Sequence, residues 1–278
     1  MQTAAVTRIA HLSDVHMLDP RPSRSRSGYS MRVRFLSIGR PLDAAARTRK
    51  LARGLSAAKR SGASHIVISG DLTEIGAPEE FEAFAEALHD AHLDPDTVTL
   101  VPGNHDAYTS PDGWQKALDG PLAAFARGAA TAPGKVVDRG NVCFFPLDVT
   151  RVQPVTRSAG ELTDRAAEAF EKRSSDPAFA HRALVLVQHH PPFSHATGAW
   201  QWIDGLAGGA RLMALLARLP NLHALHGHLH YVVDKIVNLG RARVFGAPAI
   251  VDDTDGVPRV RLYDVRDGRI ESAGLIGG

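Results

Sequence analysis

Short apolar stretches alternate along the chain with segments whose apolar residues recur at the spacing of a helix face. The apolar, partly β-branched stretches predict buried strands at residues 8–13, 66–71, 97–101, 141–148, 183–187 and 222–226. Helical composition or spacing predicts helices over residues 43–60, 78–90, 163–173 and 206–219. This alternation is typical of βαβ units around a largely parallel sheet. Residues 231–276 hold short β-rich segments between turns and predict a meander that continues a sheet.

Polar residues with metal-binding chemistry directly follow five of these strands. A single Asp or His in such a position is usually a turn or surface residue. In an α/β protein, however, the carboxyl ends of the strands border the crevice where ligands bind. We therefore expect the five strand ends to form one site. Their residues are Asp14 and His16, Asp71, Asn104 and His105, His189 and His190, and His228 and His230.

These side chains offer oxygen and nitrogen atoms, which suit divalent cations such as Mn²⁺, Fe²⁺ and Zn²⁺. The chain has 1 Cys, Cys143, so an intrachain disulfide and a Cys-based zinc site are both excluded. The candidates are too many for one tetrahedral metal, and they suffice for two metals that share a carboxylate. Two such cations can hold a phosphate and activate a water between them.

Composition narrows the remaining classes of function. The 278 residues are 44% hydrophobic and carry a formal net charge of +2, so no nucleic acid polymer is expected as a partner. We expect a single domain over residues 1–278. No apolar run approaches the roughly 20 residues of a membrane-spanning helix, and residues 1–8 lack the layout of a signal peptide. We expect a cytoplasmic protein, and homo-oligomerisation stays open.

An arginine-rich segment, expected as an insertion at about residues 17–43, interrupts the alternation. It has no acidic residue between Asp19 and Asp43. One interpretation is a solvated, partly mobile surface loop. The other is a basic lid over the neighbouring site, which recruits an anionic group or makes a weak contact with an anionic membrane surface. Its arginines are Arg21, Arg24, Arg26, Arg32, Arg34 and Arg40.

The ordered motifs resemble those of the calcineurin-like metallophosphoesterases. They are Asp14-x-His16, Gly70-Asp71, Gly103-Asn104-His105-Asp106, His189-His190-Pro191-Pro192 and Gly227-His228-x-His230. Within that family the chain is most similar to the bacterial cyclic-nucleotide and glycerophosphodiester phosphodiesterases, over residues 9–230. The resemblance implies an α/β fold, a four-layer α/β/β/α sandwich of two mixed β-sheets flanked by helices.

The resemblance also implies which residues bind the two divalent metal ions. Asp14, His16 and His230 would bind the first metal. Asn104, His189 and His228 would bind the second, and Asp71 would bridge both. A metal-bridging hydroxide would then attack the phosphorus, and no protein nucleophile is needed.

His105 would face the substrate phosphate and stabilise the transition state or protonate the leaving oxygen. The resemblance suggests Glu74 as the residue that orients His105, with Asp106 as the other candidate. His190 would lie behind the ligands or face the substrate. His195 lies in a stretch with two tryptophans, Trp200 and Trp202, and that stretch either borders the substrate or has a packing role.

The leading functional hypothesis is hydrolysis of small phosphodiesters, either cyclic nucleotides or glycerophosphodiesters. A pyrophosphatase for a lipid-linked or nucleotide substrate is the second hypothesis, in which the segment at residues 17–40 would grip the lipid or diphosphate. A phosphomonoesterase is a third enzyme of the same family. A non-catalytic scaffold that binds a partner protein is less favoured, because His105 and every ligand position are filled.

Overall fold

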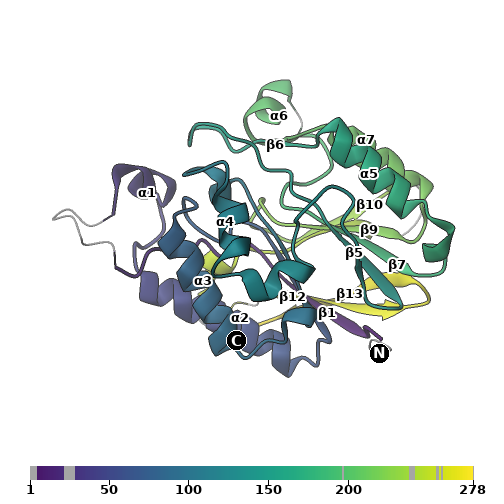
Figure 1. The fold of residues 1–278 in the computed structure, drawn as a ribbon, viewed down its shortest axis with the longest axis horizontal. Coiled ribbons are helices and arrows are strands. Elements are labelled where there is room, and N and C mark those ends of the chain that lie inside the picture. The colour runs from purple at the N-terminus through teal and green to yellow at the C-terminus, as the bar shows by residue number, and fades with distance from the viewer. Residues whose placement is uncertain are drawn as a thin grey trace.

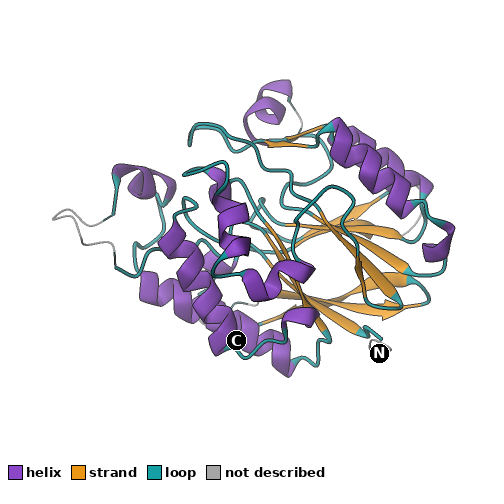
Figure 2. Ribbon diagram, viewed as in Figure 1, coloured by secondary structure: helices purple, strands orange, loops and turns teal. Residues whose placement is uncertain are grey.

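The computed structural model describes residues 5–21, 29–195, 197–237, 242–254, 257 and 259–277. In this part of the chain, two β-sheets lie face to face between two layers of helices (Figure 1). Colouring by secondary structure separates the central strands from the helices outside them (Figure 2). The predicted four-layer α/β/β/α sandwich is confirmed.

The first sheet has the strand order β13-β12-β1-β2-β3. Its three parallel strands are β1 (Arg8–Leu12), β2 (His65–Ser69) and β3 (Val98–Val101). The antiparallel strands β12 (Val260–Arg266) and β13 (Arg269–Ile276) extend it. Its outer face is covered by α2 (Ala44–Arg60), α3 (Pro78–Asp90) and α4 (Gly113–Asp119).

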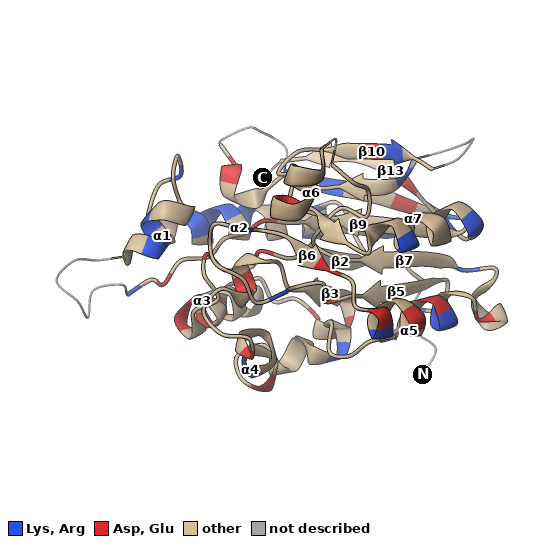
Figure 3. Cartoon of the chain, turned by 90° about the horizontal axis from the view of Figure 1, so that it is seen from above, with Lys and Arg blue, Asp and Glu red and all other residues tan. Residues whose placement is uncertain are grey.

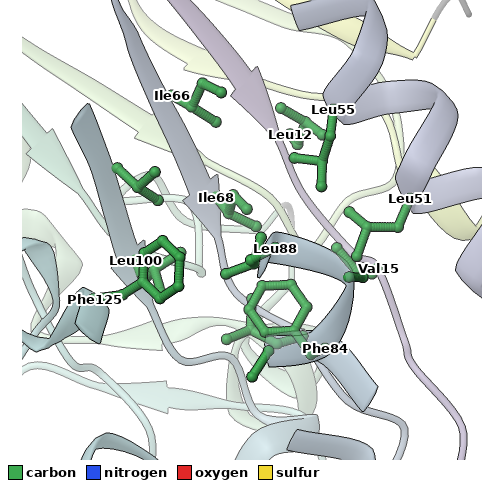
Figure 4. Packing of buried hydrophobic residues seen from close by; sticks show 14 of the residues in the cluster. Leu12, Val15, Leu51, Leu55, Ile66, Ile68, Phe84, Leu88, Leu100 and Phe125 are labelled. Carbon is green, nitrogen blue, oxygen red and sulfur yellow. The ribbon is translucent and has the colours of Figure 1, made fainter. Parts of the chain in front are cut away.

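Side chains of the first sheet alternate between two cores, because successive residues of a strand point to opposite faces. Leu12, Ile68 and Leu100 pack against the helices, with Leu55 and Phe84 on the helical side (Figure 4). The intervening strand residues point toward the second sheet. The alternation thus builds the helix-facing core and the core between the sheets from the same strands.

The second sheet has the strand order β10-β11-β9-β7-β5-β4. Its parallel strands are β5 (Val142–Pro146), β7 (Ala183–Val187), β9 (Leu222–His226) and β11 (Ala242–Gly246). Antiparallel edge strands β4 (Val137–Asp138) and β10 (Val233–Ile236) complete it. Helices α5 (Asp164–Ser174) and α7 (Gly209–Arg218) cover its outer face.

Both faces of the central strands are buried, which explains why they read as continuous apolar runs. Val67 and Tyr263 of the first sheet meet Phe144, Val185 and Phe245 of the second in one core. Full burial of such a side chain stabilises the fold by about 1.5–3 kcal/mol. The contact between the sheets therefore fixes how their carboxyl ends lie relative to each other.

Several helix and strand boundaries predicted from the sequence agree closely with the structure. The helix predicted over residues 78–90 is α3 (Pro78–Asp90), with Pro78 in its first turn as expected. The strands predicted at residues 183–187 and 222–226 are β7 and β9. Among the described residues, no helix has both the length and the apolar composition to cross a membrane.

Three expectations need correction. The helix predicted from residue 206 begins at Gly209. Leu206–Ala207 instead form strand β8, which pairs with β6 (Gly160–Glu161). Gly208 then turns the chain with a φ of 80°. The C-terminal segments do not continue one sheet: β10 and β11 join the second sheet, whereas β12 and β13 join the first. The arginine-rich segment is not all loop, since Met31–Leu36 form helix α1, capped by Ser30 and anchored by buried Val33.

Candidate functional site

The loops that follow β1, β2, β3, β7 and β9 carry the predicted site residues and converge where the carboxyl ends of the two sheets meet (Figure 1). Main-chain hydrogen bonds join these loops: Asp14 N donates to Gly70 O at 3.1 Å, and Gly227 N donates to His189 O at 3.0 Å. Asp14, Asp71 and His189 are buried there. Folding therefore gathers polar groups that are far apart in the sequence.

The backbone at these strand ends is strained. Non-glycine residues rarely adopt a left-handed φ, and such conformations concentrate at functional sites. Position 103 requires glycine because Asp71 approaches it closely: a Cβ there would lie 2.2 Å from Asp71 Oδ1. The left-handed site residues are Asp14 (φ 53°), His16 (52°), Asp71 (49°), His228 (69°) and His230 (61°).

Asp14, His16 and His230 form one group whose ligand atoms all lie within 4.8 Å of one another. His230 Nε2 is 3.4 Å from Asp14 Oδ1. His230 Nδ1 is 2.9 Å from Asp252 Oδ2, on the short helical turn Ile250–Asp252. Because that carboxylate accepts a hydrogen from Nδ1, the Nε2 atom of His230 is left to face Asp14.

Asp14, Asp71 and His189 form a second group, whose ligand atoms also lie within 4.8 Å of one another. His189 Nε2 is 3.3 Å from Asp71 Oδ2 and 4.0 Å from Asp14 Oδ1. His189 Nδ1 donates to the Ser69 carbonyl at 2.8 Å, which directs Nε2 into the site. Asp71 Oδ2 also lies 3.7 Å from His16 Nε2. Asp71 thus contacts histidines of both predicted metal positions.

Asn104 and His228 border the second group. The amide of Asn104 donates through Nδ2 to Tyr108 Oη at 3.0 Å, which leaves Oδ1 free to face the site. His228 Nε2 lies 3.0 Å from both the carbonyl and Oδ1 of Asp204, so its Nδ1 is the remaining ligand atom. The ring of His228 lies 5.2 Å from that of His189, centroid to centroid.

His105 projects toward the same space without a carboxylate behind it. Its Nδ1 donates to the main-chain carbonyl of Glu74 at 2.7 Å, and its Nε2 lies 3.9 Å from Asp71 Oδ2. Glu74, the residue that the resemblance suggests for orienting His105, thus contacts it through a main-chain atom and not through its carboxylate. Asp106 is directed elsewhere, since its carboxylate accepts from Gly103 N at 2.8 Å and from Thr73 Oγ1 at 2.6 Å.

The carboxylate of Glu74 faces the first group of ligands. Glu74 Oε2 pairs with Arg47 and lies 3.5 Å from His16 Nδ1. Arg47, fully buried on α2, also donates to the His16 carbonyl at 2.6 Å and to Ser37 Oγ at 3.0 Å. Glu74 therefore supports His16 with its side chain and His105 with its backbone.

His190 and His195 lie beyond the ligand groups. His190 is fully buried, and its Nε2 donates to the Ser158 carbonyl at 2.6 Å. Its ring packs against His228 at 4.4 Å. His195 Nε2 lies 3.5 Å from Asp204 Oδ2. The ring of His190 thus contacts that of His228 directly, whereas His195 connects to His228 through Asp204, which the sequence did not single out.

Burial and neighbouring charges set the protonation of the metal-free site. Burial, with His105 and Arg40, holds the pKa of His16 well below its usual range. Burial opposes protonation of His189, but Asp71 and Asp14 raise its pKa to about 9. In the same way Asp14 and Asp252 outweigh burial and raise the pKa of His230 to about 10. The carboxylates thus hold protons on two histidines that cations would displace.

Divalent cations fit this donor set. Both ring nitrogens of His16, the Nε2 atom of His189 and the Oδ1 atom of Asn104 are buried and have no hydrogen-bond partner among the described residues. Leaving such atoms unpaired is costly unless a ligand compensates them. Nitrogen and oxygen donors around shared carboxylates are suited to first-row transition metals.

The arginine-rich segment reaches the site at two points. Arg32 Nη2 donates to the Tyr108 carbonyl at 2.8 Å, and Arg40 Nη2 lies 3.7 Å from Glu74 Oε1. Figure 3 shows the basic residues of α1 on an arm that projects from the main body. Arg24 and Arg26 lie outside the described residues.

The fold is similar to that of other solved structures. A dimetal phosphatase from Danio rerio superposes with a TM-score of 0.70 at 13% identity, covering 98% of this chain and 96% of that one. The protein TT1561 of Thermus thermophilus superposes with a TM-score of 0.56 at 15% identity, covering 97% and 99%. At these identities the likeness concerns the fold alone.

Sequence comparison is more specific. Over 168 residues the chain is 26% identical to the glycerophosphodiester phosphodiesterase GpdQ of Enterobacter lignolyticus (strain SCF1). The match covers 59% of this chain and 55% of GpdQ, so the chain spans about half the length of that relative. The family model of calcineurin-like phosphoesterases matches residues 7–232, and the chain therefore belongs to the calcineurin-like phosphoesterase family.

Proposed function

We propose that this protein is a metal-dependent phosphodiesterase that hydrolyses small diesters such as cyclic nucleotides or glycerophosphodiesters. The observation that carries the proposal is the set of buried ligand atoms without partners around Asp71. The similarity to GpdQ, a glycerophosphodiester phosphodiesterase, favours diesters over monoesters. A phosphodiester carries a single negative charge at neutral pH and has two ester oxygens, of which one must leave.

Two divalent cations, drawn from Mn²⁺, Fe²⁺ and Zn²⁺, would be held by seven residues. Bound there, they would offset charge on the phosphoryl oxygens and lower the pKa of a coordinated water toward neutrality. Asp71 would contribute to both positions, as its contacts with His16 and His189 suggest. The first position would use Asp14, His16 and His230, and the second Asn104, His189 and His228.

His105 would act on the substrate itself. Its Nδ1 carries the hydrogen given to the Glu74 carbonyl, so Nε2 alone is available for the substrate. A protonated Nε2 can donate to a phosphoryl oxygen or to the departing alkoxide. The main-chain N–H of His105 donates to Asp71 Oδ1 at 2.9 Å, which fixes the backbone beside the site. Orientation of His105 thus depends on backbone atoms.

The test compares bis-p-nitrophenyl phosphate with p-nitrophenyl phosphate, using metal-stripped protein refilled with Mn²⁺. Asn104→Ala removes one ligand, and His181→Ala, at an exposed position, is the matched control. We expect diester turnover that requires metal and collapses only in Asn104→Ala. Preference for the monoester would make the protein a phosphomonoesterase. Failure to bind metal would overturn the proposal and favour a partner-binding scaffold.

A lipid-linked pyrophosphate is the second candidate substrate, and helix α1 favours it. Met31 and Phe35 of α1, and Ile38 just after it, are 79%, 51% and 73% exposed beside the arginines of the arginine-rich segment. Apolar and cationic side chains on one exposed element suit an anionic lipid surface. Activity on a lipid pyrophosphate that rises with anionic liposomes, and falls in Phe35→Ser, would favour this candidate over the diesterase.

A further inference from the structure

The side-chain amide of Asn104 has two chemically different ends, and only one of them can bind a cation. Its Oδ1 atom is an acceptor, whereas Nδ2 carries two hydrogens and accepts nothing. Asn104 is buried; its Nδ2 donates to Tyr108 Oη at 3.0 Å, and its Oδ1 has no hydrogen-bond partner among the described residues. A half-turn of the amide would place Nδ2 where Oδ1 lies and would direct its hydrogens toward the predicted metal.

The hydroxyl of Tyr108 decides between these two orientations, because its own hydrogen is already donated. Tyr108 Oη donates to the main-chain carbonyl of Arg157 at 3.0 Å. A carbonyl oxygen only accepts, and a phenol, with an ordinary pKa of about 10, has a single hydrogen to donate at neutral pH. Tyr108 Oη therefore meets Asn104 as an acceptor. In the reversed amide, two acceptor oxygens would face each other at a buried position without a hydrogen between them, which is costly.

The carbonyl that receives the Tyr108 hydrogen is itself held in place. Arg157 Nε donates to the Trp202 carbonyl at 2.7 Å, and its guanidinium lies over the Trp202 ring, 4.3 Å from the centroid. The main-chain N of the next residue, Ser158, donates to the Ile203 carbonyl at 2.9 Å. Trp202 and Ile203 belong to helix α6 (Gly198–Asp204). The Arg157 carbonyl is thus fastened to one helix from both sides.

Tyr108 is also anchored from the side of the arginine-rich segment. Its carbonyl accepts from Arg32 Nη2 at 2.8 Å. Its ring is buried and meets the ring of His105 edge to face, with 5.1 Å between the centroids. Because both the backbone and the ring of Tyr108 are held, its hydroxyl stays directed toward Asn104.

We propose that Tyr108 is a positioning residue for the second metal position. Its hydroxyl, oriented by the Arg157 carbonyl, selects the amide orientation in which Asn104 Oδ1 faces the cation. This inference rests on the proposed function, in which Asn104 is a ligand of that position. Partners behind a ligating side chain fix its orientation, and their loss costs about 10–100-fold in metal affinity.

The test removes one oxygen atom. Tyr108→Phe keeps the ring against His105 and deletes the hydroxyl. Tyr29→Phe is the matched control, because Tyr29 Oη also donates to a main-chain carbonyl, that of Asp19, at 2.9 Å. Calorimetric titration of the metal-stripped full-length protein with Mn²⁺ reports the second position in the His16→Ala background, where the first position lacks a ligand.

We expect Tyr108→Phe to lower the Mn²⁺ affinity about tenfold and Tyr29→Phe to leave it unchanged. Because the defect lies in metal binding, saturating Mn²⁺ should restore hydrolysis of bis-p-nitrophenyl phosphate when Tyr108→Phe is the only substitution. Equal affinities of Tyr108→Phe and Tyr29→Phe would overturn the inference.

Asn104→Asp separates orientation of the amide from general support of the site. A carboxylate has two equivalent oxygens, so either end can face the cation. Tyr108→Phe should therefore change the Mn²⁺ affinity little in the Asn104→Asp background. A loss as large as that measured with the native Asn104 would show that Tyr108 does not act by orienting the amide.

Asn104→Ala distinguishes failure of this inference from failure of the proposed function. If Asn104→Ala lowers the Mn²⁺ affinity and Tyr108→Phe does not, Asn104 is a ligand and only the role of Tyr108 is wrong. If neither substitution lowers it, Asn104 is not a ligand and the inference fails together with that assignment. Metal-dependent hydrolysis of bis-p-nitrophenyl phosphate by the unaltered protein decides the phosphodiesterase proposal separately.

Discussion

Two carboxylates outside the predicted ligand set should each control one metal position. Asp204 holds His228 of the predicted second position, and Asp252 holds His230 of the first. Replacing either by Ala removes the acceptor that fixes the imidazole tautomer and ring orientation. We therefore expect Asp204→Ala to weaken only the second position and Asp252→Ala to weaken only the first.

The contacts set the size of the effect. Loss of a partner behind a ligating histidine typically costs 10–100-fold in metal affinity. In Asp204→Ala, His228 Nε2 can still donate to the main-chain carbonyl of residue 204, which lies at 3.0 Å. We therefore expect a loss of metal affinity at the low end of this range, about tenfold. His230 Nδ1 loses its 2.9 Å partner outright in Asp252→Ala, so about tenfold or more is expected there.

Calorimetric titration of metal-stripped protein with Mn²⁺ measures both effects. His16→Ala isolates the second position, and Asn104→Ala isolates the first. Asp204→Ala should lower Mn²⁺ affinity in the His16→Ala background and leave it unchanged in the Asn104→Ala background. Asp252→Ala should give the reverse result. Equal weakening in both backgrounds would refute the assignment of one carboxylate to each position.

Three further outcomes are expected. The pKa values of His189 and His230 are raised to about 9 and about 10 in the metal-free protein. Mn²⁺ must therefore displace protons, and its affinity should fall as the pH is lowered from 9 to 6. Calorimetry in buffers of different ionisation enthalpy would detect the released protons, and an absence of proton release would contradict these pKa values. Burial raises the pKa of Glu80 from 4.5 to about 8, so its contribution to stability is full below pH 4.5 and is lost as the pH rises through about 8. Glu80→Gln should therefore raise the free energy of unfolding by about 4–5 kcal/mol at pH 8.5 and little at pH 4.5, as measured by urea denaturation, and a gain independent of pH would argue against the shift. Gly103→Ala should abolish Mn²⁺ binding or folding, because its Cβ would lie 2.2 Å from Asp71 Oδ1, and circular dichroism would separate the two results.

Patterns within short windows of sequence predicted much of this protein. The apolar runs of β7 and β9 stand out because both faces of a central parallel strand are buried. The start of helix α3 was predicted from Pro78, and its extent was predicted from the spacing of the residues on its one apolar face. The strand-end motifs placed Asp14, Asp71 and His189 at one edge, because the carboxyl ends of parallel strands lie together. The order of these motifs along the chain also identified the family.

Contacts between distant segments were decided only by the tertiary structure. Asp204 and Asp252 follow no strand of the predicted core, and nothing in their local sequence marks them as partners of His228 and His230. The support of His105 by a main-chain carbonyl has no side-chain signature. The C-terminal strands joined different sheets, because strand pairing depends on which edges are exposed once the core has formed. Sequence periodicity reports the faces that each segment buries, whereas the partners of those faces and of the buried polar groups depend on packing across the whole chain.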